Sequence, residues 1–125
     1  MTPKTSEINF RDIPVEISSR ITRQLMQNEI PQVICYNRVR YRYYILTDKR
    51  IMDVYVLSKN DIRITTMFLN DVDQIEDYSS GSFYGYKIIK LGKTIMTIII
   101  DNANELAVEF GNKLYQSFNE AKYSH

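Results

Sequence analysis

The hydrophobic positions near the start of the chain repeat every four residues. They are Ile17, Ile21 and Leu25, which follow Pro14. This spacing puts the three side chains on one face of a helix, and proline is well placed at the beginning of one. The pattern predicts a helix over about 14–28, preceded by a polar tail over 1–12.

The period then changes to two, which is the signature of half-buried strands. A strand is expected from about Gln32. From residue 39 the two faces carry different side chains: Val39, Tyr41, Tyr43 and Ile45 on one, and Arg40, Arg42, Tyr44 and Leu46 on the other. Strands over 50–57 and 62–68 follow, separated by short polar turns. Consecutive strands with such short connections predict an antiparallel meander.

The second half of the chain alternates an acidic stretch, two strands and a helix. Residues 71–77 are acidic and residues 79–82 (Ser-Ser-Gly-Ser) are loop-like, whereas the stretches 84–91 and 94–100 are apolar and are separated by a Gly-Lys turn signal. A final amphipathic helix is predicted over about 103–118, from Leu106, Phe110, Leu114 and Phe118 at four-residue spacing. Gly111 inside this helix indicates close approach to a strand. The elements together predict one domain over 13–120.

Two segments resemble the bacterial pleckstrin-homology-like domains and the related GRAM domains. They are residues 44–51 (Tyr-Ile-Leu-Thr-Asp-Lys-Arg-Ile) and residues 68–75 (Phe-Leu-Asn-Asp-Val-Asp-Gln-Ile). In that family a strand ends in Leu-Thr-Asp/Asn-Lys/Arg-Arg, and an acidic residue, matched here by Glu29, precedes the first strand. The resemblance covers about 25–118.

This resemblance implies a mainly β (α+β) fold. The expected architecture is a curved antiparallel sheet, or partly open barrel, of about seven strands with a carboxy-terminal helix capping one end. The helix over 14–28 is an addition to that pattern. Because a fold does not fix a function, the residues themselves have to supply the chemistry.

Composition excludes several kinds of chemistry. Among 125 residues there is one cysteine, Cys35, and one histidine, His125 at the very end, so Ser-His-Asp and Cys-His catalysis lack a credible base. Neither a disulfide nor a cysteine-rich metal site can form within the chain, and no cofactor motif is present. The longest apolar stretch, 95–100, is far below the roughly twenty residues of a membrane-spanning helix. With no secretory signal at the start, the expected location is the cytoplasm.

A local cluster of cations is the most suggestive chemical feature. The net charge is only +1, but a candidate anion-binding site includes Arg38, Arg40, Arg42, Lys49 and Arg50. Strand alternation would put the first three on one face, where guanidinium groups suit phosphate or carboxylate. The blander interpretation is a solvated strand face, or partners for the acidic residues at 71–77.

Two further patterns have structural explanations that we favour. Tyrosines interleaved with basic residues (Tyr41, Tyr43, Tyr44, Tyr84 and Tyr86) could stack on single-stranded nucleic acid, but tyrosine also suits half-buried strands. Carboxylate pairs such as Asp71 with Asp73, or Glu76 with Asp77, could bind a metal ion, but they also suit a surface loop.

The sequence therefore predicts a module that is not an enzyme and needs no metal or cofactor. Its expected partner is another protein or a second copy of itself, since open strand edges favour homo-oligomers. The alternative is recognition of an anionic ligand, a phosphorylated lipid headgroup ahead of nucleic acid, by the basic strand at 38–42.

Overall fold

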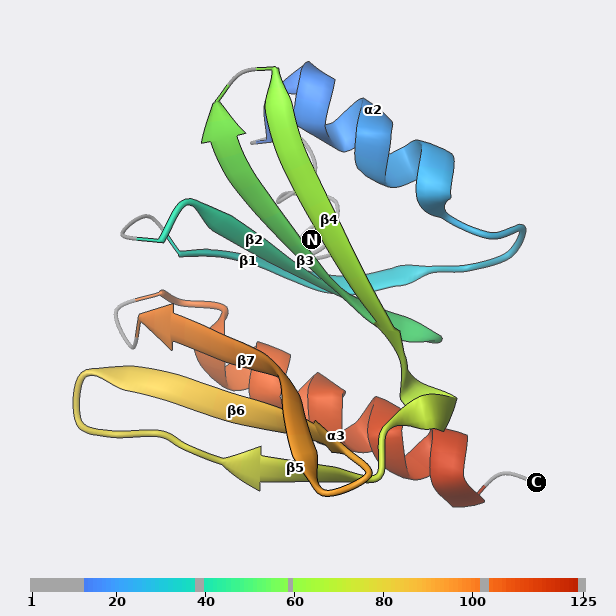
Figure 1. The fold of residues 1–125 in the computed structure, drawn as a ribbon, viewed down its shortest axis with the longest axis vertical. Coiled ribbons are helices and arrows are strands. Elements are labelled where there is room, and N and C mark those ends of the chain that lie inside the picture. Colours follow the sequence, from blue (N-terminus) through green and yellow to red (C-terminus); the bar gives the residue numbers. More distant parts are fainter. Residues whose placement is uncertain (1–12, 38–39, 59, 102–103, 124–125) are drawn as a thin grey trace, which may run out of the picture.

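The computed structural model describes residues 13–37, 40–58, 60–101 and 104–123. In this part of the chain there are two antiparallel sheets and two α-helices (Figure 1). The first sheet has the order β1-β2-β3-β4, and its strands are β1 (Pro31–Asn37), β2 (Arg42–Thr47), β3 (Arg50–Ser58) and β4 (Asp61–Phe68). The second has the order β5-β6-β7, and its strands are β5 (Gln74–Asp77), β6 (Phe83–Lys90) and β7 (Lys93–Asp101).

The predicted seven strands are present, and the turn after β4 divides them into two sheets. A short 3-10 helix, η1 (Leu69–Asp71), follows β4 directly, and its Leu69 side chain is fully buried. Val72, the next residue, is also fully buried. These two side chains turn the chain into the core, so β5 starts a new sheet instead of pairing with β4. The mainly β class and the meander order are confirmed.

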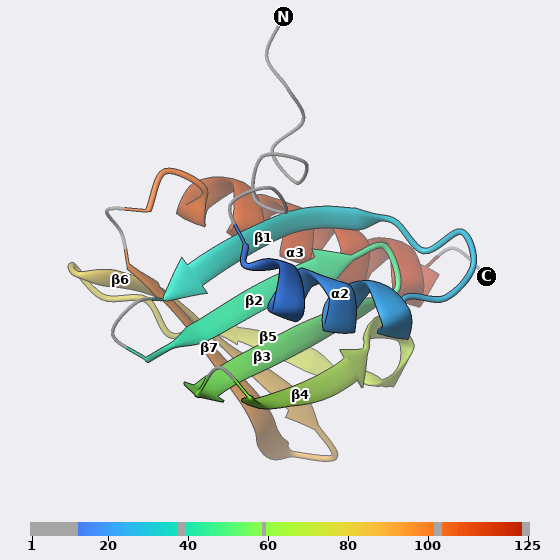
Figure 2. The same ribbon diagram turned by 90° about the horizontal axis from the view of Figure 1, so that it is seen from above.

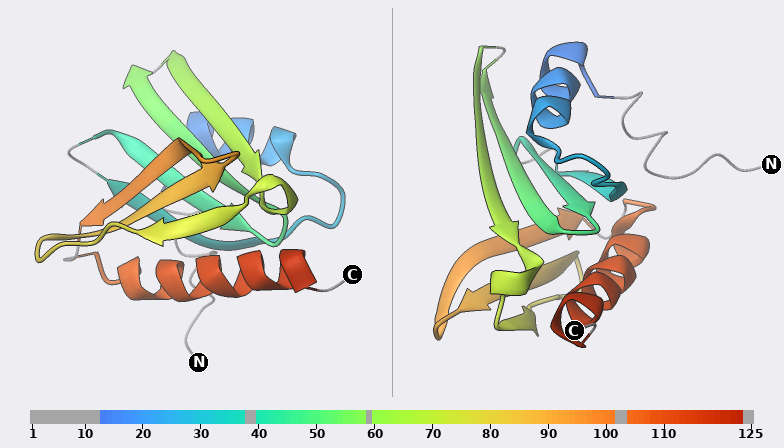
Figure 3. Two further views of the ribbon diagram at one scale, coloured as in Figure 1. Left: turned by 60° about the horizontal axis from the view of Figure 1, so that its bottom comes forward. Right: turned by 90° about the vertical axis from the view of Figure 1, so that its right-hand side faces the viewer.

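Each helix covers a different surface of the sheets. Helix α2 (Val15–Gln24) lies across the outer face of the first sheet (Figure 2), where Ile17 and Ile21 pack on Ile34, Ile45 and Met52. Helix α3 (Ala107–Tyr123) runs along one side of the molecule, between the two sheets (Figure 3). The first sheet is thus covered on both faces, one by α2 and the other by the core.

The main core lies between the sheets and α3. Fully buried Phe110 and Leu114 project into it from the helix and join side chains from both sheets. Gly111 confirms the predicted close approach, because a Cβ at this position would overlap the hydroxyl oxygen of Tyr86 on β6. The helix needs glycine there for contact and not for backbone conformation.

Three predicted boundaries differ from the structure. Helix α2 ends at Gln24, not near residue 28, because Leu25 is extended. Helix α3 starts at Ala107 and runs to Tyr123. The stretch 71–77, expected as a loop, contains the short strand β5, which Ile75 anchors against the core.

Candidate functional site

The basic residues predicted to bind an anion lie at two ends of β2. Arg40 is exposed in the turn before the strand and Arg42 starts it, whereas Lys49 and Arg50 follow its far end. At about 3.3 Å per residue, six-residue β2 separates the two groups by about 17 Å. Arg38 lies outside the described residues. The structure therefore does not bring the four described cations to one surface.

The expected strand face of arginines is interrupted by a turn. Tyr41 has a φ of +56°, in the left-handed region, and its carbonyl accepts the Val56 N–H at 2.9 Å. Arg40 therefore belongs to a turn and does not share the strand face of Arg42, contrary to the prediction. The alternation of arginine and tyrosine continues through this turn, so the sequence pattern alone does not reveal it.

The Arg42 side chain forms an ion pair and a cation–π contact within the protein. Its Nη1 lies 2.7 Å from Oδ2 of Asp53, and its guanidinium stacks over the Tyr55 ring at 4.3 Å. Burial raises the pKa of Asp53, against the smaller lowering effect of the Arg42 hydrogen bond. Arg42 is thus held in an ion pair, whereas Arg40 is an exposed cation in the turn before β2.

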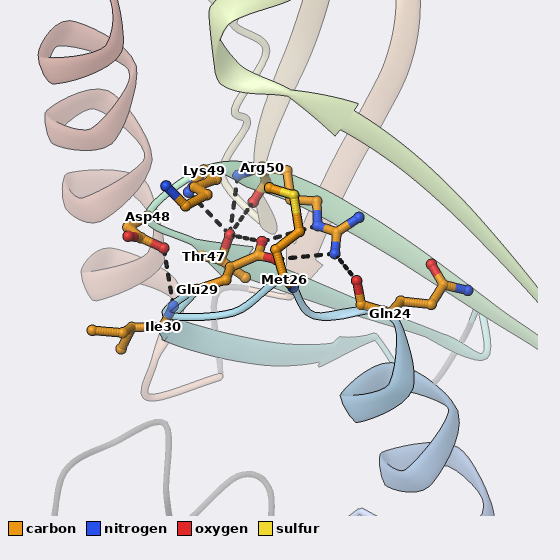
Figure 4. Close-up of polar contacts among 8 residues, drawn as sticks. All are labelled: Gln24, Met26, Glu29, Ile30, Thr47, Asp48, Lys49 and Arg50. Atoms are coloured by element: carbon orange, nitrogen blue, oxygen red, sulfur yellow. Dashed lines mark hydrogen bonds and ion pairs between the residues drawn. The ribbon is translucent and has the colours of Figure 1, made fainter.

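At the other end of β2, a buried polar network ties the segment after α2 to the β2–β3 turn (Figure 4). The Glu29 carboxylate accepts hydrogen bonds from Arg50 Nε at 2.9 Å and from the Thr47 hydroxyl at 2.6 Å. Arg50 also donates to the Gln24 carbonyl, and Met26 N–H donates to Glu29 at 2.9 Å. Although burial opposes it, these hydrogen bonds lower the pKa of Glu29.

This network explains the residues that carry the family resemblance. The Thr47 hydroxyl oxygen accepts the backbone N–H groups of Lys49 and Arg50 at 3.1 and 3.0 Å, which shapes the turn. Glu29 and Arg50 are both buried, and their opposite charges form an ion pair with each other. The motif therefore stabilises the fold, and of its two cations only Lys49 has an exposed side chain.

The other candidate residues are dispersed. Among the tyrosines proposed to stack on nucleic acid, Tyr44 and Tyr86 are buried, Tyr43 and Tyr84 are half-buried, and Tyr41 is exposed in a turn. Burial also raises the pKa of the Cys35 thiol to about 12. In the described ranges, no cluster of histidine, cysteine, aspartate or glutamate could hold a metal ion. No helix in those ranges is long and apolar enough to cross a membrane.

An open strand edge is the feature that the sequence did not locate. Strand β4 pairs with β3 on one side and has no neighbouring strand on the other (Figure 2). Its eight residues are mostly β-branched or apolar, with charges only at Asp61 and Arg63. The sequence predicted open edges in general, but strand order, which decides which strand is last, is not a local property.

The hydrogen-bond pattern identifies the backbone groups that face outward. Leu69 N–H donates to the Lys49 carbonyl at 2.9 Å, and bonded pairs alternate along an antiparallel ladder. In the observed register, Arg63, Thr65 and Met67 therefore bond to β3. The backbone groups of Ile62, Ile64 and Thr66 point away from β3, and none of them has a hydrogen-bond partner within the described chain.

The other strand edges are partly covered or short. The Asn37 side chain donates to the Ile99 carbonyl on β7 at 2.6 Å, and the Asn104 side chain donates to the Tyr36 carbonyl on β1 at 3.4 Å. Strand β5 has only four residues. Strand β4 is thus the longest edge in the described structure without such a cover.

Comparison with known proteins identifies the fold. No family model matches the chain, and no curated protein matches it. Among solved structures, a pleckstrin homology domain from Shewanella amazonensis SB2B is similar, with a TM-score of 0.62 and 14% identity over 90% of each chain. A DUF1696 family protein with a pleckstrin-homology domain from Shewanella loihica PV-4 gives a TM-score of 0.62 and 11% identity, over 82% of this chain and 94% of that one.

These similarities establish the architecture of the chain. It has the fold of bacterial pleckstrin-homology domains, mainly β with a carboxy-terminal helix, as the resemblance implied, and its seven strands form a sheet of four and a sheet of three. A fold alone does not fix a function, so any function of this chain has to be argued from its surface residues.

Proposed function

We propose that this chain is a non-enzymatic module that joins proteins by strand addition at the edge of β4, and that its partner there is a second copy of the same chain. The observation that carries the proposal is the row of free backbone groups at Ile62, Ile64 and Thr66. An exposed edge of this kind is a template for pairing with another strand.

The composition of β4 favours pairing over protection. Natural edge strands are commonly blocked by proline, by inward-pointing lysine, or by a bulge in the middle. The interior of β4 has none of these, and its irregularity in pairing lies at the start, opposite Val56 and Ser58. Ile62 and Ile64 pack against the cluster under α2, which holds the strand in place for a partner.

Two substitutions at Thr66 test the proposal with a matched control. Proline removes the outward N–H of this residue without removing a bond to β3, and proline is tolerated at such edge positions. Valine keeps the N–H and the side-chain shape. Sedimentation velocity across the micromolar range should show self-association of the unmodified protein, its loss in Thr66→Pro, and its retention in Thr66→Val.

Two results would contradict the proposal. One is an unmodified protein that stays monomeric up to about 100 μM, a concentration at which even weak specific contacts with micromolar dissociation constants are occupied. The other is equal self-association of the proline and valine variants, which would put the contact elsewhere. Circular dichroism and urea unfolding of each variant establish that the fold is retained.

Anion recognition is a second candidate function, favoured by the exposed Arg40. Its guanidinium has no ion-pair partner in the described structure, and Arg42 lies two residues away. The test replaces Arg38, Arg40 and Arg42 by glutamine and measures binding to acidic liposomes and to oligonucleotides. Binding that depends on salt and disappears in the triple variant supports this function, and the same binding by both proteins contradicts it.

A further inference from the structure

A groove beside the added helix gathers side-chain hydrogen-bond donors. It lies between α2 and the β3–β4 hairpin (Figure 1) and has a volume of about 460 Å³. Four of its side chains carry N–H or O–H groups: Ser19, Arg20, Arg23 and Asn60. Within the described chain, none of these four side chains has a hydrogen-bond or ion-pair partner. The groove therefore presents a set of donors that are open to an acceptor from outside the chain.

The two arginines lie on one side of α2 and are both exposed. Residues three apart in a helix are neighbours, with Cβ atoms about 5 to 6 Å apart, so both guanidinium groups can reach one small anion. On the buried side of the helix, Ile17 and Ile21 pack against the first sheet. This packing fixes the backbone from which both arginines project, which lowers the entropic cost of binding.

The charge of the groove favours an anion. Glu16 is the acidic side chain in the lining, so the two arginines leave a formal charge of +1. Glu16 precedes Arg20 by four residues, a spacing that allows an ion pair, but none joins them. Val15 and Ile62 add apolar surface beside the cations. The lining thus suits an anionic group attached to a small carbon skeleton.

The donor set fits a phosphate ester better than a carboxylate. A phosphate monoester has three terminal oxygens and carries nearly two negative charges at neutral pH, whereas a carboxylate has two oxygens and one charge. The planar guanidinium group binds phosphate through two parallel hydrogen bonds. Two arginines can therefore engage the terminal oxygens together, while the Ser19 hydroxyl and the Asn60 amide supply further donors.

We propose that the groove between α2 and the β3–β4 hairpin binds a phosphate monoester, with Arg20 and Arg23 on its terminal oxygens. The site is separate from the basic residues around 38–42, and it does not depend on pairing at the edge of β4. It is built by the helix that the family resemblance does not include. Because the same group occurs in small phosphorylated metabolites and in the headgroup of phosphatidic acid, the experiment includes both sources.

Nuclear magnetic resonance titration with glycerol 3-phosphate tests the site. Ionic strength is held constant with NaCl, so that general screening does not change during the titration. We expect a dissociation constant of about 1 mM or less, with shifts at the N–H signals of Arg20, Arg23 and Asn60. Arg20→Gln/Arg23→Gln should weaken binding about tenfold or more. Glycerate, a carboxylate with a similar skeleton, should bind more weakly than the ester.

Matched variants control for charge and for self-association. Lys113→Gln/Lys122→Gln removes two positive charges from α3 and should leave the affinity unchanged. The triple glutamine variant of the basic strand and Thr66→Pro should also bind the ester as the unmodified protein does, because neither alters the groove. Glu16→Gln should tighten binding, since it raises the formal charge of the groove from +1 to +2.

Cosedimentation with vesicles identifies the source of the phosphate. The vesicles are phosphatidylcholine with about one-fifth phosphatidic acid. Binding of the free ester alone indicates a soluble ligand, whereas vesicle binding that Arg20→Gln/Arg23→Gln abolishes indicates the lipid headgroup, and both results support the site. The proposal is overturned if neither vesicles nor about 10 mM ester bind, or if the double variant binds as tightly as the unmodified protein. Equal affinities for glycerate and the ester would overturn the assignment to phosphate.

Discussion

A Gly111→Ala substitution would measure how closely α3 approaches β6. In an exposed helix interior, replacing glycine by alanine stabilises a protein by about 1 kcal/mol. Here the added Cβ would overlap the Tyr86 hydroxyl oxygen, and the Tyr86 side chain is only 4% exposed and has little room to move. Overpacking of this kind costs about 1 to 3 kcal/mol. We therefore expect Gly111→Ala to be neutral or to destabilise by up to about 2 kcal/mol.

The Tyr86→Phe background tests the cause of that cost. Removing the hydroxyl leaves the ring carbon Cζ as the nearest atom, 3.1 Å from the added Cβ, a distance that a shift of the ring can relieve. Gly111→Ala should then be stabilising or neutral, with a coupling energy of about 1 to 2 kcal/mol between the two sites. Urea unfolding of the four proteins gives the cycle. Equal effects of Gly111→Ala in both backgrounds, or stabilisation of the unmodified protein by 1 kcal/mol, would refute this packing.

Three further perturbations address the core, the buried ion pair and the alkaline limit of stability. Phe110→Ala should destabilise by about 3 to 5 kcal/mol in urea unfolding, because its ring is fully buried; a loss below about 1 kcal/mol would place the ring outside the core. Arg50→Met should cost about 3 to 5 kcal/mol, since it leaves the Glu29 carboxylate buried without a counter-charge; Glu29→Leu added to it should recover part of the loss, and no recovery would mean that Arg50 acts through other contacts. Burial raises the pKa of Cys35 from 9.0 to about 12 and that of Tyr86 from 10.0 to about 12, so the folded state keeps protons that the unfolded state loses. The stabilisation from these two groups is therefore fully present below about pH 9 and is lost as the pH rises toward 12. Cys35→Ala should flatten the decline in the free energy of unfolding between pH 9 and 10, measured by urea titrations at fixed pH.

The elements that could be predicted are those with strong local periodicity. Ile17 and Ile21 mark the buried face of α2, and Phe110 and Leu114 mark that of α3. The alternation of side chains also predicted strands β2 to β4, because at least one face of each strand is covered by other parts of the protein. In these segments the repeat of side chains reports directly on burial.

The remaining features depend on contacts between distant segments. Helix α2 ends at Gln24 because the Gln24 carbonyl accepts a hydrogen bond from Arg50, twenty-six residues later, and the Met26 N–H donates to the Glu29 carboxylate. Strand β5 has only Ile75 to indicate it, so its acidic neighbours dominate the pattern. The separation of Arg42 from Lys49 and Arg50 follows from the turns at both ends of β2. None of these features is visible within a short window of sequence.

The helix that the family resemblance did not include bears on how the edge of β4 can be used. Helix α2 covers one face of the first sheet, while the other face is directed to the core, so the two sides of β4 are chemically different. A two-fold axis perpendicular to the sheet keeps both α2 helices on the same face of the joined sheets. In the proposed assembly, the fold supplies the edge at β4, and the added helix makes the two faces beside that edge different, so the partner strand meets an α2-covered face on one side and the core on the other.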